Sequence, residues 1–247
     1  MSQDRIWAYY QNERRESFRG SETRLKFLAG QARARLRRDP AARVLNIGVG
    51  AGQFEAVALK LGLDVHSLDP NEKAIAAVQR LLAGSEKAKT GRVEAIPFPE
   101  AYFEAVVASE LLEHLPDQIL TTALGEINRV LVPGGYIIGT VPSREDLLVQ
   151  TVICPNCGSE FHRWGHCQYF DPARLEAWLS PFFLILELEA RPFIPWSILN
   201  WKGKLAGVLK TLLGKLGQHS SDEFLFFLGR KRPPHPEPAG SGSRAAS

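Results

Sequence analysis

Short runs of strand-forming residues alternate with longer stretches whose apolar positions recur at helical spacing through the middle of the chain. The predicted strands are Arg43–Ile47, Val65–Leu68, Val93–Ile96, Tyr102–Ala108, Tyr136–Val141, Phe182–Leu188 and Phe224–Gly229. The predicted helices are Gln53–Leu61, Glu72–Leu82, Gln118–Leu131 and Pro172–Leu179. Strands that alternate with helices in this way predict an α/β fold with a parallel sheet covered on both faces.

The flanking segments differ from this repeating unit. Residues 1–40 predict a helical N-terminal extension, because residues 1–38 have the character of helices, with apolar positions from Ile6 to Leu28, and Asp39-Pro40 then breaks the pattern. We expect one domain over residues 41–231, interrupted by a cysteine-containing loop at 152–170 and an insertion at 192–221. Residues 232–247 are rich in Pro, Gly, Ser and Ala and are predicted to be disordered.

Composition narrows the class of protein. The chain has 247 residues, 45% of them hydrophobic, and a net charge of +3, which disfavours a nucleic-acid partner. Residues 24–38 hold six Lys or Arg and no acid, and we interpret them as a solvated helix face. A polar start, no long apolar run and only three cysteines predict a cytoplasmic protein without a signal peptide or membrane span.

A glycine-rich turn follows the first predicted strand. Gly48, Gly50 and Gly52 alternate with other residues in VLNIGVGAGQF, so the backbone can bend sharply and a ligand can approach bare main chain. The turn also opens a helix, whose N-terminal amides favour a negative group. The third glycine of a G-x-G-x-x-G dinucleotide site is missing, which disfavours NAD.

An acid ends the next predicted strand. Asp69 follows the glycine turn by about 20 residues, a spacing at which a carboxylate can accept hydrogen bonds from both hydroxyls of a ribose. The alternative is that Asp69 only caps the helix that follows. Together, turn and acid predict a site for a nucleoside-containing ligand.

From residue 44 to residue 141 the chain resembles the class I S-adenosylmethionine-dependent methyltransferases, in particular the group that includes the ubiquinone- and menaquinone-biosynthesis enzymes. The motifs that carry this resemblance, in order, are VLNIGVGAGQF, SLDP, AIPFPEAYFEAVVASELLEHLPD and INRVLVPGGYIIGTVP. The resemblance implies a Rossmann-like, doubly wound sheet of seven strands with the last strand antiparallel.

The resemblance also implies roles for individual residues. The three glycines would pass the methionyl part of S-adenosylmethionine, Asp69 would hold its ribose, and Ser109 and Glu110 would line the pocket floor near the methyl group. Residues around 93–96, Glu94 and Ala95 among them, would flank the adenine. Asn46 stands where the family usually has an acid, and Arg92 stands roughly where an acid near the adenine is common.

Methyl transfer is an in-line displacement, so the protein mainly positions a nucleophile against the methyl carbon. A hydroxyl nucleophile benefits from a general base, and we expect His114 with Glu113 to supply it. The alternative is that both residues only flank the turn before Pro116.

All three cysteines and two histidines fall in one window, CPNCGSEFHRWGHC. Cys154, Cys157, His162 and His166 offer the donor set of a tetrahedral structural zinc, which would staple the loop beside the active-site entrance. Cys167 could replace His166. A metal-free dithiol and a redox Cys-x-x-Cys are the alternatives.

The late insertion contains no acid from Arg191 to Ser221 and repeats apolar positions at helical spacing. Residues 197–216 therefore predict a basic amphipathic helix: a peripheral membrane contact, a lid over an apolar substrate, or an ordinary packed helix.

The sequence as a whole predicts a methyltransferase that acts on a small-molecule or a lipid- or glycan-linked acceptor, with transfer to oxygen. A non-catalytic binding module and an RNA methyltransferase are the alternatives, and the latter lacks the Asn/Asp-Pro-Pro-Tyr/Phe motif of many base-methylating enzymes.

Overall fold

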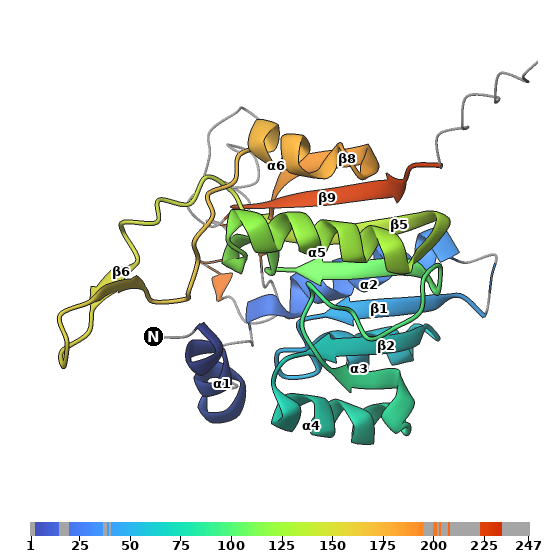
Figure 1. Cartoon of the computed structure of the whole chain (residues 1–247), viewed down its shortest axis with the longest axis horizontal. Helices are drawn as coiled ribbons and strands as arrows, with labels where there is room; N and C mark the ends of the chain where they lie inside the picture. Colours follow the sequence, from blue (N-terminus) through green and yellow to red (C-terminus); the bar gives the residue numbers. More distant parts are fainter. Residues whose placement is uncertain are drawn as a thin grey trace, which may run out of the picture.

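The computed structural model describes residues 3–14, 20–36, 39, 41–194, 200, 201, 203, 207 and 223–233. Within these ranges the chain forms an open sheet with the strand order β3-β2-β1-β4-β5-β9-β8 (Figure 1). The strands are β1 (Arg43–Ile47), β2 (Asp64–Asp69), β3 (Ala88–Thr90), β4 (Phe103–Ser109), β5 (Leu131–Pro142), β8 (Phe183–Pro192) and β9 (Glu223–Lys231).

Strand direction confirms the predicted fold. β1 pairs in parallel with β2 on one side and with β4 on the other. The pairs β2–β3 and β4–β5 are also parallel. β9 runs antiparallel to both of its neighbours, β5 and β8. The sheet is therefore the seven-stranded, doubly wound arrangement with an antiparallel last strand.

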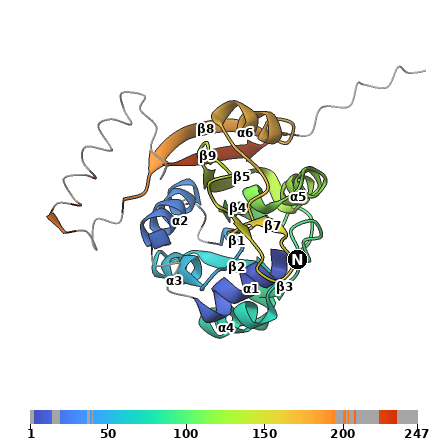
Figure 2. The same cartoon turned by 90° about the vertical axis from the view of Figure 1, so that its left-hand side faces the viewer.

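Helices cover both faces of the sheet, as Figure 2 shows for α2 and α3 on one side and α5 on the other. Leu225 and Phe227 of β9 face one hydrophobic cluster, whereas Phe226 and Leu228 face the other. A strand buried on both faces reads as a continuous apolar run, which is what β9 shows. The helices are α1 (Gln3–Glu13), α2 (Glu22–Leu36), α3 (Gln53–Lys60), α4 (Glu72–Leu82), α5 (Asp117–Val130) and α6 (Pro172–Leu179), with short 3-10 turns η2 (Ser85–Lys87) and η3 (Leu112–His114).

One predicted strand was wrong. The strand beside β2 is β3 at Ala88–Thr90, whereas Val93–Ile96 forms a turn closed by a bridge between Arg92 and Ala95. The side chains of Val93 and Ile96 are buried, so their apolar character reflects packing of a turn against the core. The predicted N-terminal helical region is divided into α1 and α2, with residues 15–19 outside the described part.

The cysteine window forms a small β-hairpin of β6 (Thr151–Ile153) and β7 (Glu160–His162), which extends away from the sheet in Figure 1. The predicted helix at 197–216 lies largely outside the described residues, and so does the predicted disordered tail beyond residue 233. None of the described helices combines the length and the apolar character needed to cross a bilayer.

Candidate active site

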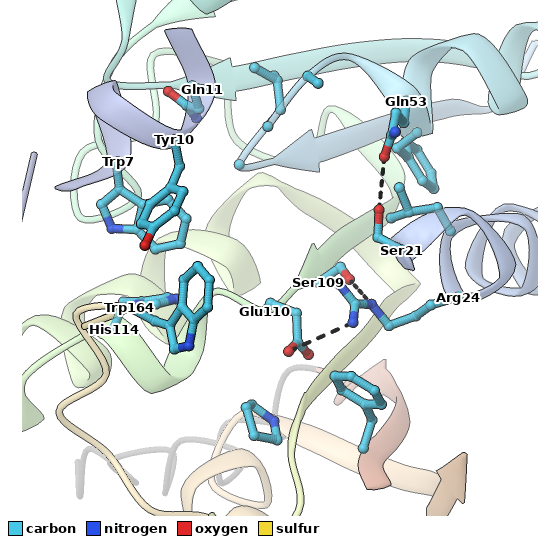
Figure 3. A pocket seen from close by; sticks show the side chains of 18 of the residues that line it. Trp7, Tyr10, Gln11, Ser21, Arg24, Gln53, Ser109, Glu110, His114 and Trp164 are labelled. Atoms are coloured by element: carbon cyan, nitrogen blue, oxygen red, sulfur yellow. Dashed lines mark hydrogen bonds and ion pairs between the residues drawn. The ribbon is translucent and has the colours of Figure 1, made fainter. Parts of the chain in front are cut away.

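A cavity of about 500 Å³ opens where the carboxyl ends of β1, β2, β4 and β5 meet. Three further segments wall it in: α1, the start of α2, and the loop after the β6–β7 hairpin (Figure 3). In open α/β sheets this edge is where ligands bind, because the loops there surround a crevice at the switch in strand order.

The glycine turn adopts the backbone that the sequence predicts. Gly48, Gly50 and Gly52 have φ values of +86°, +53° and +79°, in the left-handed region that favours glycine. Gly48 and Gly50 line the cavity, whereas Gly52 stands at the N-terminus of α3. The turn therefore presents main chain to the cavity at Gly48 and Gly50, as expected.

Asp69 converges on that turn. One carboxylate oxygen, Oδ2, accepts a hydrogen bond of 2.9 Å from the backbone amide of Val49, and Oδ1 accepts one of 2.8 Å from the amide of Asn71. The side chain is 2% exposed, and burial raises the pKa of Asp69 while these hydrogen bonds oppose the rise. Carboxylate and glycine turn thus face the same space.

Gln11 of α1 is a site residue that the sequence did not indicate. Its side-chain amide donates a 2.9 Å hydrogen bond to Asp69 Oδ2 and accepts one of 2.6 Å from the Asn71 side chain. No local motif marks a lone glutamine in a polar helix, because its role arises only when α1 packs over the edge of the sheet.

The acid that the resemblance places at position 46 has a counterpart nearby. Asn46 lines the cavity and donates a 2.8 Å hydrogen bond to the carboxylate of Glu55, which also accepts one of 2.8 Å from Ser67. Glu55 is fully buried, and this desolvation raises its pKa. A carboxylate therefore lies one hydrogen bond behind Asn46.

The end of β4 carries polar groups into the cavity, as predicted for Ser109 and Glu110. Arg24 of α2 reaches both: its Nε donates to Ser109 Oγ at 3.2 Å, and its Nη1 lies 3.8 Å from Glu110 Oε2 (Figure 3). Glu110 has a φ of +55°, a strained conformation that is often found at functional sites. The Arg24 side chain is 14% exposed, so its interpretation as part of a solvated face was wrong.

Of the two residues predicted to supply the general base, His114 faces the cavity and Glu113 lies behind it. His114 lines the cavity, and its Nδ1 donates a hydrogen bond of 3.2 Å to the carbonyl of Gly165, which leaves Nε2 as the basic nitrogen. Glu113 is fully buried behind it, with Oε1 3.8 Å from His114 Nε2. Burial lowers the pKa of His114 well below its usual value and raises that of Glu113 well above its own. His114 is therefore neutral at pH 7.

Glu94 and Ala95 lie in the turn after β3, and neither lines the cavity. Aromatic side chains from two distant segments line another end of the cavity. The ring of Trp7 packs edge-on against His114 with ring centroids 4.2 Å apart, and the ring centroids of Tyr10 and Trp164 are 4.8 Å apart. An apolar part of a ligand could pack against these rings.

The four predicted metal ligands surround one small hollow of about 260 Å³. Gly158 has a φ of +69°, and its backbone amide donates to the Cys154 carbonyl at 2.9 Å, which closes a turn around the two cysteines. The hydrogen bond with Ser159 is the main cause that lowers the pKa of the Cys157 thiol to about 7. Cys167 is exposed. Among the described residues, two groups of three side chains have their possible metal-binding atoms within 4.8 Å of one another. One group is Glu145, His162 and His166, the other is Glu113, His114 and His166, and neither contains a cysteine.

Residues 45–139 match a family model described as a methyltransferase domain. The ubiquinone biosynthesis O-methyltransferase of Xanthomonas axonopodis pv. citri is 30% identical over 170 residues, which cover 65% of this chain and 70% of that protein. The protein of the same name from Alkalilimnicola ehrlichii is 27% identical over 177 residues, covering 66% of this chain and 68% of its own.

A solved structure shares the fold. The 1,6-didemethyltoxoflavin-N1-methyltransferase of Burkholderia thailandensis, with bound 1,6-didemethyltoxoflavin and S-adenosylhomocysteine, aligns with a TM-score of 0.65 at 18% identity, over 93% of this chain and 87% of that chain. The topology of the sheet, the hydrogen bond between Asp69 and the glycine turn, and the sequence identity to the Xanthomonas protein all indicate the same family. The chain belongs to the family of S-adenosylmethionine-dependent methyltransferases that includes the ubiquinone biosynthesis O-methyltransferases.

Proposed function

We propose that this enzyme transfers the methyl group of S-adenosylmethionine to an oxygen atom of a small-molecule or a lipid- or glycan-linked acceptor. The observation that carries the proposal is the hydrogen bond between the Asp69 carboxylate and the Val49 amide of the glycine turn, at the wall of one cavity. The relatives from Xanthomonas axonopodis and Alkalilimnicola ehrlichii are named O-methyltransferases, which supports oxygen as the acceptor atom.

The residues fit the parts of this cofactor. Gly48 and Gly50 leave bare backbone for its methionyl part, and Asp69 accepts from the ribose hydroxyls. Arg24 is a cation that faces the cavity and suits the cofactor carboxylate. Asn46, which keeps its amide oxygen for the cavity while its nitrogen donates to Glu55, suits the ammonium group. Ser109 and Glu110 line the floor between these groups and His114, and Glu94 and Ala95 are assigned to the adenine end by resemblance alone.

When bound, S-adenosylmethionine supplies an electrophilic methyl group on a sulfonium sulfur. His114 would then act as the general base, its Nε2 accepting the proton of the acceptor hydroxyl, while the sulfur of the cofactor would keep the electron pair of its bond to the methyl group. Glu113 does not line the cavity, and we assign it a packing contact with His114, whose Nε2 lies 3.8 Å from Glu113 Oε1 without a hydrogen bond.

The proposal includes zinc in the loop at 152–170. The sequence indicates Cys154, Cys157, His162 and His166 as its donors, and these residues line the smaller hollow. Glu145 is a further donor close to the same two histidines. Both donor sets contain His162 and His166, so the two histidines carry this part of the proposal.

A cytoplasmic location, with peripheral membrane contact through residues 197–216, completes the proposal. The absence of acids from that segment supports it, since basic amphipathic helices bind anionic lipid surfaces. Nucleic acid is not among the proposed partners, because the chain as a whole is only mildly basic.

Calorimetry with S-adenosylmethionine tests the cofactor site. Asp69→Asn removes the charge that accepts from the ribose and should weaken binding about 10- to 100-fold, because hydrogen bonds to charged groups contribute about 1.5–3 kcal/mol. Asp64→Asn, at the opposite end of β2, is the matched control and should bind as the wild type does. Equal affinity in both variants would contradict the assignment of Asp69.

The acceptor atom is tested with labelled cofactor. Cell extract incubated with enzyme and methyl-labelled S-adenosylmethionine should yield a labelled product whose methyl group is bonded to oxygen by NMR. A label on nitrogen or carbon would overturn the O-methylation proposal and leave cofactor binding untouched.

A further inference from the structure

Two imidazoles and one carboxylate lie together at the wall between the two hollows of the molecule. Glu145 follows β5, His162 ends β7, and His166 follows the turn after β7. Glu145 and His166 line the large active-site cavity, whereas His162 and His166 line the small hollow beside the cysteines. His166 therefore belongs to both.

The donor atoms of these three side chains already converge. Glu145 Oε2 pairs with His166 Nδ1, and Glu145 Oε1 lies 3.6 Å from His162 Nε2. The two imidazole rings stack with centroids 4.6 Å apart and planes 20° from parallel. One donor atom from each residue lies within 4.8 Å of the other two, a spacing that a small cation at their centre can bridge.

His162 gives an independent indication of a missing ligand. The side chain is nearly buried, with the residue 8% exposed, and its Nε2 has no hydrogen-bond partner although it points toward Glu145. Buried polar atoms are normally satisfied, so an orphaned nitrogen that faces a carboxylate requires an explanation. A metal ion between them would satisfy both.

We infer that Glu145, His162 and His166 form a site for a divalent transition-metal ion, with zinc as the preferred ion, that opens onto the active-site cavity. Two histidines and one carboxylate are a donor set that zinc accepts, and three protein ligands leave the fourth position open. Since Glu145 and His166 line the cavity, we assign the open position to an oxygen of the acceptor. The inference rests on the proposed function and revises its zinc site: Glu145 takes the place of the two cysteines, and His162 and His166 stay as ligands.

Loading the ion changes two contacts, because the pair of Glu145 Oε2 and His166 Nδ1 must separate to admit it and a contact of His162 in the loop is lost. The backbone amide of His166 donates to His162 Nδ1 at 3.1 Å, so the neutral ring carries its proton on Nε2. When a metal occupies Nε2, this proton moves to Nδ1 and the amide contact opens. The amide contact and the Glu145–His166 pair are thereby exchanged for bonds from the metal to its three ligands.

The site differs from a cysteine clip in ligand identity, and cobalt(II) separates the two. Thiolate ligands give cobalt an intense charge-transfer band in the near ultraviolet, whereas nitrogen and oxygen ligands do not. We expect one equivalent of zinc or cobalt per full-length chain, a cobalt spectrum without the thiolate band, and metal retained in the Cys154→Ser/Cys157→Ser double variant.

Glu145→Gln should lower zinc affinity by more than about 100-fold, because changes outside the ligand shell alone cost 10- to 100-fold. Glu160→Gln, in β7 on the cysteine side of the hollow, is the matched control and should keep wild-type affinity. Should Glu145→Gln fail to fold, Glu145→Asp keeps the charge, withdraws the oxygens by one methylene and should also weaken binding.

The inference is overturned if Glu145→Gln binds zinc as the wild type does, if the double cysteine variant loses the metal, or if wild-type protein binds none. Calorimetry with S-adenosylmethionine on the same samples keeps this outcome separate from the proposed function. Loss of metal with intact cofactor binding concerns only the metal site, whereas loss of cofactor binding in metal-loaded wild type concerns the enzyme assignment itself.

Discussion

Gln11 and Asp69, 58 positions apart in the chain, share a hydrogen bond of 2.9 Å at the cofactor end of the cavity. The same Asp69 oxygen already accepts from the Val49 amide, so both of its lone pairs are occupied. A ribose hydroxyl that binds this oxygen must therefore replace the Gln11 amide. Because Gln11 belongs to α1, which also places Trp7 against His114, cofactor binding and the aromatic end of the cavity share one helix.

Gln11→Ala should strengthen binding of S-adenosylmethionine by about 10-fold. The ligand then no longer displaces a hydrogen bond to a charged group, a contribution of roughly 1.5 kcal/mol or more. Calorimetry measures the affinity, and Glu13→Ala, at the exposed end of the same helix, controls for a general effect on α1. A fall in affinity would mean instead that Gln11 contacts the bound ribose.

Arg24→Gln should weaken cofactor binding by about 10-fold or more. The substitution removes the cation assigned to the cofactor carboxylate and leaves the half-buried Glu110 without its ionic partner. Lys26→Gln on the same helix is the control, because its side chain is 61% exposed. If both variants bind alike in titrations at matched salt concentration, the carboxylate lies elsewhere in the cavity.

Short sequence motifs predicted those site residues whose positions depend on one strand and the turn that follows it. The glycine turn and Asp69 are set by the ends of two neighbouring strands, so spacing alone placed them together. Arg24 and Gln11 were missed because their positions depend on how α1 and α2 pack across the sheet edge. The proximity of Glu145 to His162 was also missed, since the intervening hairpin folds back over a distance that no motif spacing encodes.

The strand prediction failed at Val93–Ile96 for a related reason. Burial of two apolar side chains in a turn gives the same sequence signal as a short strand, and only pairing with β2 identifies Ala88–Thr90 as the sheet edge. The long apolar strands were predicted because burial on both faces fixes their composition.

Glu55→Gln should stabilise the protein at pH 8 relative to the wild type. Burial raises the pKa of Glu55 in the folded state, so folding favours its protonated form. Glu55 therefore lowers the free energy of unfolding at pH values above its raised pKa. This destabilisation disappears as the pH falls toward 4.5, the ordinary pKa of a glutamate. Each unit of pKa difference corresponds to about 1.4 kcal/mol.

Urea unfolding at pH 8 and pH 5 measures this difference, with exposed Glu86→Gln as the control. The advantage of Glu55→Gln should be larger at pH 8 than at pH 5. A constant difference at both pH values would mean that the ionisation of Glu55 does not limit stability.

Gly139→Ala in β5 should destabilise the fold by about 1–3 kcal/mol or more, because overpacking a filled core forces backbone to move. A Cβ at this position would lie 2.1 Å from the Ala108 carbonyl oxygen and 2.3 Å from the Phe227 ring. The first of these is main chain of the adjacent strand β4, so no side-chain rotation relieves the contact. Gly30→Ala is the matched control, since a Cβ there meets nothing within 4 Å and α2 should gain about 1 kcal/mol of helix propensity. The two variants should thus shift the melting temperature in opposite directions, and equal shifts would show that Ala108 and Phe227 do not fill the space beside Gly139 as described.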